Sequence, residues 1–119
     1  MNILIVDDSR AMRLIVRRTL RQAGFEGLDV EEACTGKEAL TMIRGKTYHL
    51  VLSDWNMPEM SGIDLLTTLR KEGNKVTFGF ITSEGTGDMR LRASEAGAQF
   101  LIAKPFSPET LAEALSGIL

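Results

Sequence analysis

The chain has 119 residues, enough for one domain with a hydrophobic core. Hydrophobic residues make up 44% of it and charged residues 25%, and the formal net charge of −2 does not favour a nucleic-acid-binding protein. No apolar run approaches the ~20 residues of a membrane span, and we expect neither a signal peptide nor membrane contact. The single cysteine excludes an internal disulfide, which suits a reducing, cytoplasmic location.

Apolar runs alternate with amphipathic or capped segments along the chain. The predicted strands cover residues 2–6, 29–34, 50–54, 76–81 and 99–103. The predicted helices run from a cap at Ser9 to about Ala23, from Thr35 to about Arg44, from Ser61 to near 72–74, from about Asp88 to Ala96, and from Ser107 onward. The second strand is more polar than the others and is expected at an edge. This alternation predicts an α/β fold, a doubly wound five-stranded parallel sheet with five helices on its two faces.

The first predicted helix has two different faces. Its expected buried face consists of Met12, Ile15, Val16, Thr19, Leu20 and Ala23. Its opposite face carries the arginines at positions 10, 13, 17, 18 and 21, with Leu14 among them. These arginines form either a solvated helix face or a docking surface for an acidic partner, and the sequence leaves both interpretations open.

Several other residues carry weaker expectations. Residues 35–38 have the form of a capping box. Gly79 lies between two phenylalanines, which indicates a bulge or a close helix approach in its strand. Cys34 is expected in or near the core, and His49 in a loop or on the surface. The segment 85–90 lacks the third glycine of a dinucleotide-binding fingerprint, so no organic cofactor is predicted there.

Polar residues stand where the predicted strands end. They are Asp7 and Asp8 after the first strand, Asp54 at the third, Thr82 and Ser83 at the fourth, and Lys104 at the fifth. Because the carboxyl ends of parallel strands meet at one edge of a sheet, we expect these side chains to be neighbours. Each has a simpler interpretation alone, as a helix cap, an Asx turn before Pro58 or an ordinary strand end. Their joint placement favours one site.

The residue types at this edge indicate phosphoryl chemistry. Three carboxylates repel one another, and a single lysine does not balance them. A hard divalent cation is the natural addition, and Mg²⁺ fits because it binds a few carboxylates together with a phosphate, whereas the lack of Cys and His argues against zinc. Asp54 is then a candidate nucleophile toward phosphorus, with Lys104 and the metal neutralising the phosphoryl oxygens. The Thr82 hydroxyl is expected to donate to one such oxygen, and the small Ser83 leaves room for the group.

The motifs of this edge resemble those of a known family. They are Asp7-Asp8, Asp54 with Trp55-Asn56-Met57-Pro58, Thr82-Ser83-Glu84 and Lys104-Pro105-Phe106. Together they resemble the signature of the receiver domain of two-component response regulators, over residues 1–119, and are most similar to single-domain regulators of chemotaxis. The resemblance implies a flavodoxin-like fold with strand order 2-1-3-4-5. It also implies a phosphorylation-activated switch rather than an enzyme, one that assists its own phosphorylation and dephosphorylation.

The resemblance assigns roles to the acidic residues. It implies that Asp54 is the phosphoacceptor, and that the donor is a phosphohistidine on a sensor kinase or phosphotransfer domain. It implies that Asp8, Asp54 and the backbone carbonyl of Asn56 bind Mg²⁺, with Asp7 helping through water. Thr82 and Lys104 would contact the phosphoryl group.

The resemblance also concerns how the signal ends and where it goes. Asn56 and Glu84 match the chemotaxis type at the two positions that tune hydrolysis of the acyl phosphate. The family usually has Tyr or Phe three residues before the lysine, and here that residue is Leu101. We therefore predict a signal without the usual aromatic flip, carried by Thr82 and the loop 85–87. The output would be a separate protein, such as the flagellar motor, or a downstream domain of a longer regulator, without direct nucleic-acid binding.

Two other classes of function remain as alternatives. An aspartyl-nucleophile phosphatase needs a second acid two residues after the nucleophile, where this chain has Asn56. A flavodoxin-like nucleotide binder needs a phosphate-binding loop after the first strand, where Asp7 and Asp8 would repel a phosphate. Both alternatives therefore fit the sequence less well than a phosphoacceptor switch.

Overall fold

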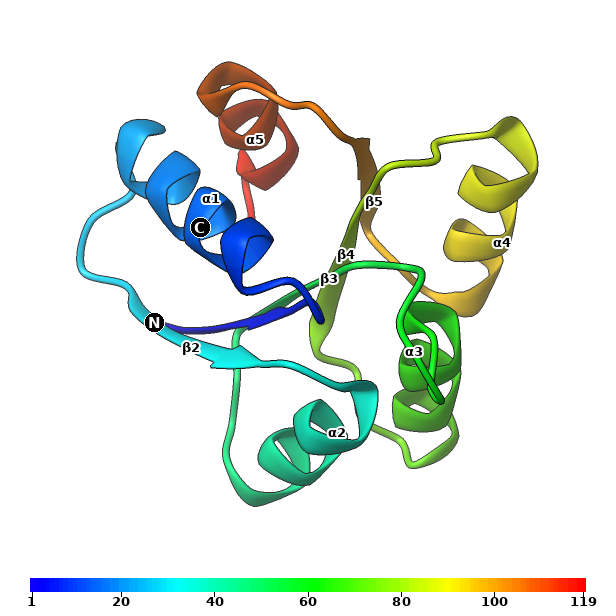
Figure 1. Ribbon diagram of the computed structural model, residues 1–119. Coiled ribbons are helices and arrows are strands. Elements are labelled where there is room, and N and C mark those ends of the chain that lie inside the picture. The colour runs from blue at the N-terminus through cyan, green and yellow to red at the C-terminus, as the bar shows by residue number, and fades with distance from the viewer.

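The computed structural model describes residues 1–119 and shows a parallel sheet between two layers of helices (Figure 1). The strands are β1 (Asn2–Val6), β2 (Asp29–Ala33), β3 (Leu50–Ser53), β4 (Thr77–Thr82) and β5 (Phe100–Ala103). The helices are α1 (Arg10–Gln22), α2 (Gly36–Gly45), α3 (Gly62–Lys71), α4 (Gly87–Ala96) and α5 (Pro108–Leu115). The strand order β2-β1-β3-β4-β5 confirms the predicted doubly wound fold and places β2 at an edge.

The helices divide between the two faces of the sheet, with α1 and α5 on one face and α2, α3 and α4 on the other (Figure 1). Alternate residues of the central strands supply the two cores. Leu4 and Val6 of β1 join the core on the side of α2, α3 and α4, whereas Ile3 and Ile5 join the core on the side of α1 and α5. Burial of both faces explains why these strands are continuously apolar instead of alternating.

Each helix begins at a Ser or Thr whose side-chain oxygen accepts a hydrogen bond from a backbone N–H of the first turn. These N-cap residues are Ser9, Thr35, Ser61, Thr86 and Ser107. The reciprocal capping box predicted at residues 35–38 is incomplete, because the Glu38 carboxylate accepts from the Cys34 N–H at 3.3 Å instead of from Thr35. The complete box forms at Ser61 and Asp64.

The buried stripe of α1 is narrower than predicted. Its buried residues are Val16, Thr19 and Leu20. Ile15, expected on this face, is 43% exposed, so that prediction is wrong. The helix therefore packs through fewer side chains than its apolar periodicity indicates.

The bulge predicted at Gly79 is absent from β4. The registers of β4 with β3 and with β5 both run through Gly79 without a break. The ring of Phe100 on β5 covers it instead, and a Cβ at Gly79 would lie 2.1 Å from that ring. His49 is exposed, as predicted, and its Nδ1 accepts from the Asn2 N–H at 2.8 Å.

Candidate functional site

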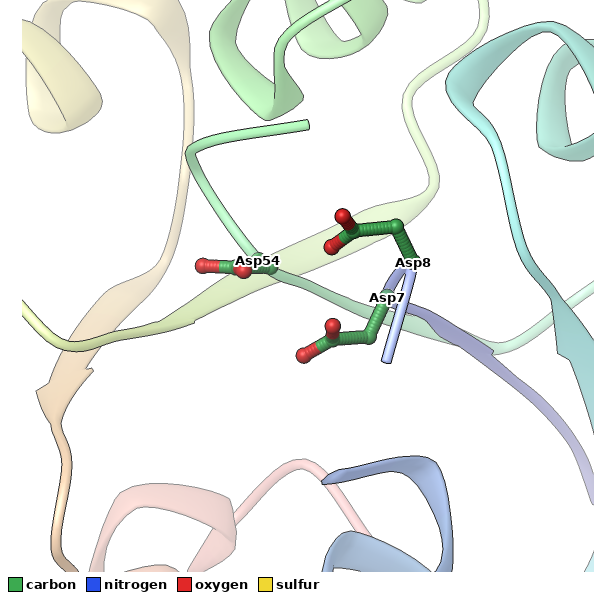
Figure 2. A group of neighbouring side chains, drawn as sticks. All are labelled: Asp7, Asp8 and Asp54. Carbon is green, nitrogen blue, oxygen red and sulfur yellow. The ribbon is translucent and has the colours of Figure 1, made fainter. Parts of the chain in front are cut away.

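Three aspartates converge at the carboxyl edge of the sheet, where β1 and β3 lie side by side (Figure 2). Asp7 and Asp8 directly follow β1, and Asp54 directly follows β3. The two strands are parallel, and Val6 is paired in register with Ser53. One carboxylate oxygen of each aspartate lies within 4.8 Å of the others. The register of two neighbouring strands thus gathers acids from distant parts of the chain.

Backbone hydrogen bonds hold two of these aspartates in place. The Asp54 N–H continues the sheet by donating to the Val6 carbonyl at 2.9 Å. One carboxylate oxygen of Asp7 accepts from the Ser9 N–H at 2.9 Å, and one of Asp54 accepts from the Trp55 N–H at 2.7 Å. Each of the two carboxylates therefore keeps a second oxygen for a cation.

Lys104, the first residue after β5, reaches these second oxygens. Its Nζ lies 3.2 Å from Asp7 Oδ2 and 3.6 Å from Asp54 Oδ2. Its backbone N–H donates to the Thr82 carbonyl at 2.7 Å, which ties the ends of β4 and β5 together. One lysine among three carboxylates leaves an excess of negative charge at this edge.

The pKa of the Asp54 carboxyl is raised above its ordinary value of 3.8. Burial is the largest cause, because the charged form loses water, and the side chain is only 13% exposed. The positive charge of Lys104 and the Trp55 N–H lower this pKa in part, whereas the negative charges of Asp7 and Asp8 raise it further. A carboxylate whose ionised form is disfavoured in this way is stabilised by an added cation.

The donor set of this edge fits a hard cation. It consists of carboxylate oxygens from three aspartates and contains neither Cys nor His. Oxygen ligands of this type suit Mg²⁺, and the absence of nitrogen and sulfur donors does not suit zinc. Chemically, the arrangement offers an aspartate oxygen as a nucleophile, flanked by a lysine and by ligands for a metal ion.

Two residues contribute to the site through contacts that the sequence did not indicate. The Gly62 N–H donates to the Trp55 carbonyl at 2.8 Å, and a Cβ at Gly62 would lie 2.1 Å from the Asp54 carbonyl oxygen. Only glycine permits α3 to begin this close to the loop after β3. Arg13 of α1 donates to the Asp7 carbonyl at 2.7 Å. The sequence shows only a helix start at Gly62 and a basic helix face at Arg13.

The Thr82 side chain lies below the surface and not at the opening beside the aspartates. It is completely buried, and its Oγ1 accepts from the Glu84 N–H at 3.4 Å. Ser83 and Glu84 are exposed, as is Asn56, two residues after Asp54. The structure therefore brings the three aspartates and the lysine together, but it does not bring the Thr82 hydroxyl into contact with them.

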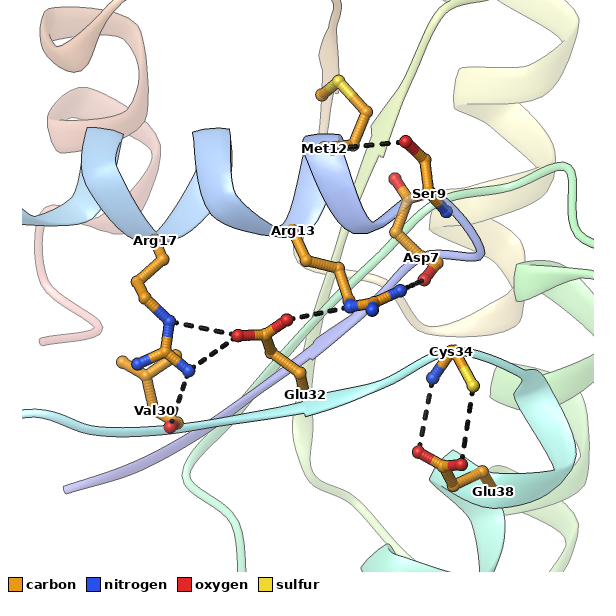
Figure 3. Close-up of polar contacts among 9 residues, drawn as sticks. All are labelled: Asp7, Ser9, Met12, Arg13, Arg17, Val30, Glu32, Cys34 and Glu38. Atoms are coloured by element: carbon orange, nitrogen blue, oxygen red, sulfur yellow. Dashed lines mark hydrogen bonds and ion pairs between the residues drawn. The ribbon is translucent and has the colours of Figure 1, made fainter.

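The arginines of α1 divide into two groups, of which Figure 3 shows one, Arg13 and Arg17. Arg13 and Arg17 turn toward β2, where each has a guanidinium nitrogen 2.8 Å from a carboxylate oxygen of Glu32. Burial acts to raise the pKa of Glu32, but the hydrogen bonds from both arginines outweigh it and lower this pKa below 4.5. The other three arginines of α1 are exposed. Two of the five arginines thus bind the neighbouring strand and do not form a free surface.

Cys34 is exposed, so the expectation of a core position is wrong. The strand β2 ends at Ala33, and Cys34 already lies in the loop before α2. Its Sγ donates to the Glu38 carboxylate at 3.5 Å (Figure 3).

The chain is similar to known signalling proteins over nearly all of its length. Residues 3–116 match the family described as the response regulator receiver domain. The chain is 42% identical to the chemotaxis protein CheY-3 of Vibrio cholerae serotype O1 over 120 residues, which covers 99% of this chain and 91% of that protein. It is 40% identical to the chemotaxis protein CheY1 of Helicobacter pylori over 122 residues, which covers 100% and 97% of the two chains.

Solved structures show the same fold. The chemotaxis protein CheY4 of Vibrio cholerae superimposes with a TM-score of 0.85 at 33% identity, over 99% of this chain and 98% of that one. The receiver domain of the Francisella response regulator 1452 superimposes with a TM-score of 0.87 at 26% identity, over 98% and 94%.

This chain belongs to the response regulator receiver domain family. Within that family it is a receiver domain of the CheY type. Such domains are signalling switches and not enzymes of the usual kind, and they typically bind Mg²⁺ at an acidic pocket, which corresponds here to the three aspartates. None of the helices is both long and apolar enough to cross a membrane.

Proposed function

We propose that this protein is a signalling switch in which Asp54 accepts a phosphoryl group. The observation that carries the proposal is the position of Asp54, which lies within 4.8 Å of Asp7 and Asp8 and 3.6 Å from Lys104. The donor is a phosphohistidine on a sensor kinase or a histidine phosphotransfer domain. An Asp54 carboxylate oxygen forms a bond to phosphorus while the bond between phosphorus and the histidine nitrogen breaks, and the electron pair of that bond stays on the imidazole.

The acidic residues have a second task in this proposal. Asp8, Asp54 and the Asn56 backbone carbonyl would hold Mg²⁺, with Asp7 acting through a water molecule. When bound, this ion supplies positive charge next to the phosphoryl oxygens. The oxygen-only donor set and the raised pKa of Asp54 support this assignment, because both favour an added cation.

Two further side chains bind the phosphoryl group in this proposal. Lys104 exchanges its contact with Asp54 for a contact with a phosphoryl oxygen, while it keeps its closer contact with Asp7 at 3.2 Å. The Thr82 hydroxyl moves from its buried position to donate to a second oxygen. Ser83, a small exposed residue, leaves room for the group to enter.

Asn56 and Glu84 tune how long the acyl phosphate lasts. Both are exposed, Asn56 two residues after Asp54 and Glu84 two residues after Thr82, which supports a role beside the path of the attacking water. A side chain there orients that water or excludes it. The switch thus assists its own phosphorylation and dephosphorylation without turning over an external substrate, and Asn56 stands where an aspartyl-nucleophile phosphatase needs a second acid.

The output of the switch is a change at the face of the fourth and fifth helices and strands, α4, α5, β4 and β5. We propose that residues 1–119 form one receiver domain and that this face controls a separate protein in chemotaxis, such as the flagellar motor. The similarity to the chemotaxis proteins of Vibrio cholerae and Helicobacter pylori, at 42% and 40% identity, supports this output.

The test is the intact mass of the protein after incubation with acetyl phosphate, with and without Mg²⁺. We expect one added phosphoryl group in the wild type, only when Mg²⁺ is present, and none in Asp54→Asn. The matched control is Asp29→Asn, because Asp29 is an exposed aspartate at the start of β2 and away from the site. A wild-type protein that stays unmodified and also fails to bind beryllium fluoride, a stable phosphoryl mimic, would contradict the proposal.

A further inference from the structure

The side chain of Arg90 joins three segments at the outer edge of the sheet. Arg90 lies in the first turn of α4, and its own N–H donates to Thr86. Its Nε donates to the Gly85 carbonyl in the loop between β4 and α4 at 3.4 Å. Its Nη1 donates to the Leu101 carbonyl of β5 at 3.0 Å. Because β5 pairs only with β4, this guanidinium occupies the place that a further strand would take at the free edge.

The loop held by Arg90 lies directly on β5. A Cβ at Gly85 would lie 3.1 Å from the Cβ of Ala103 and 3.2 Å from a guanidinium nitrogen of Arg90. It would lie 3.6 Å from a methyl group of Leu101. Since Gly85 is so close to all three residues, a movement of this loop changes the Arg90 contacts.

Phosphorylation requires such a movement. A phosphoryl group on Asp54 would replace solvent next to the aspartates, but the Thr82 side chain has no contact with solvent. A side chain that does not border this space reaches a phosphoryl oxygen only when it or its loop moves. Residues 83–85 follow Thr82 directly, so they move with it.

Leu101 cannot transmit this movement as an aromatic residue would. It is 9% exposed, and it has neither a ring to rotate nor a hydroxyl group to exchange partners. Its carbonyl, however, is the atom that Arg90 binds. The polar connection between the loop and β5 is therefore made by α4.

We propose that Arg90 is a positioning residue that couples the loop after Thr82 to α4 and β5. The bridge from Gly85 through Arg90 to Leu101 stabilises the unphosphorylated arrangement, and it breaks when the loop moves toward a phosphorylated Asp54. The inference rests on the proposed function of Asp54. The coupling that an aromatic residue at position 101 would provide is thereby assigned to Arg90, which lies eleven positions earlier in the chain.

The test measures how tightly beryllium fluoride binds at saturating Mg²⁺, by titration calorimetry on the complete chain. A contact present only in the unbound arrangement opposes binding, so its removal tightens binding. We expect Arg90→Met to bind about fivefold more tightly than the wild type, the effect of one lost hydrogen bond. Arg90→Lys also binds more tightly, because one ammonium does not span two carbonyls as a planar guanidinium does. The matched control Arg18→Met, at an exposed position of α1, stays within about twofold of the wild type.

Amide hydrogen exchange provides a readout that a change in charge alone would not alter. In the wild type, we expect exchange over residues 85–90 and 100–103 to become faster when beryllium fluoride binds. In Arg90→Met, exchange is fast before binding and changes little on binding. Thermal unfolding confirms that the variants fold, and Arg90→Lys supports the same test if Arg90→Met does not fold.

Several outcomes would overturn the inference. Unchanged or weaker binding by Arg90→Met, with the exchange response intact, would show that the bridge carries no coupling. If Arg90→Lys bound beryllium fluoride with wild-type affinity while Arg90→Met bound it more tightly, the effect would come from the positive charge and not from the bridge. Failure of the wild type itself to bind beryllium fluoride would instead overturn the proposed function, and this inference with it.

Discussion

Glu32 and Asp54 are partly buried acidic residues whose pKa values are shifted in opposite directions. The Glu32 side chain is 26% exposed and is bound by two arginines, and its pKa is lowered. The Asp54 side chain is 13% exposed and shares one lysine with Asp7, and its pKa is raised. Burial acts in the same direction on both groups, so the number of nearby cations decides the difference. A neutralised carboxylate stabilises the fold, whereas an incompletely neutralised one remains available to bind a cation.

The largest expected effect concerns Mg²⁺ binding, which separates the two carboxylates most clearly. Asp54→Asn removes a proposed ligand and is expected to weaken Mg²⁺ binding by on the order of 10- to 100-fold or more. Glu32→Gln, which removes the same charge at a paired position, is expected to change it by less than about twofold. Titration calorimetry at neutral pH measures both. Equal loss of affinity in the two variants would mean that net charge, and not the site, binds the ion.

The next largest effect concerns the free energy of unfolding without divalent ions, which the two substitutions should change in opposite directions. Glu32→Gln leaves Arg13 and Arg17 without a charged acceptor and is expected to lower the free energy of unfolding by about 1–3 kcal/mol. Asp54→Asn removes a charge that burial disfavours and is expected to raise the free energy of unfolding. Urea denaturation measures both changes, with Glu26→Gln, at an exposed position, as the control. Destabilisation by Asp54→Asn would show that its contact with Lys104 outweighs its burial.

The pH dependence sharpens the same contrast. The pKa of Glu32 is lowered in the fold, so its stabilisation is present above 4.5 and is lost as the pH falls from there through the lowered value. The pKa of Asp54 is raised, so its cost is present above the raised value and disappears as the pH falls through it to 3.8. As the pH falls, the stability difference between wild type and Glu32→Gln should therefore begin to shrink only below pH 4.5. The extra stability of Asp54→Asn should instead be lost while the pH is still above 3.8. Urea denaturation in small pH steps tests this, and parallel curves for the two variants would contradict it.

The smallest expected effect concerns Glu31, a second acidic residue of β2. It tests whether Glu31, like Glu32, makes a contact that stabilises the fold. Tyr48, the only tyrosine, donates to Glu31 Oε1 at 2.5 Å. Burial, and then its hydrogen bond to Glu31, raise the pKa of Tyr48 to about 12. Glu31→Gln is expected to lower this pKa toward 10.0 without reaching it, because the burial remains. Ultraviolet absorbance follows the phenol, and an unchanged titration would show that the Glu31 contact has little influence on it.

Local patterns in the sequence predicted most of the fold. The continuous apolar run at 3–6 indicates a strand covered on both faces, and Ser9 and Ser107 begin helices because their hydroxyls accept hydrogen bonds from the first turn. The meeting of Asp7, Asp54 and Lys104 followed from topology, since parallel strands end at the same edge of a sheet.

The wrong predictions concern residues whose surroundings come from other segments. Gly79 needs no bulge because a phenylalanine of β5 covers it, and the sequence around Gly79 carries no sign of that ring. Cys34 is exposed because β2 ends one residue before it. Ile15 fits the apolar period of α1 but is 43% exposed, because periodicity places a residue on a helix face and the packing of other segments decides how much of that face is covered.

The sequence by itself determined the order of strands and helices, the parallel sheet and the edge at which its chemistry gathers, because these depend on local periodicity, capping and chain topology. Only the tertiary structure decided which charges neutralise one another. Arg13 and Arg17 bind Glu32, and Arg90 binds the loop and β5, whereas Asp54 shares a single lysine. The energy of a charge depends on its distance from groups in other segments and on its access to water, and packing sets both.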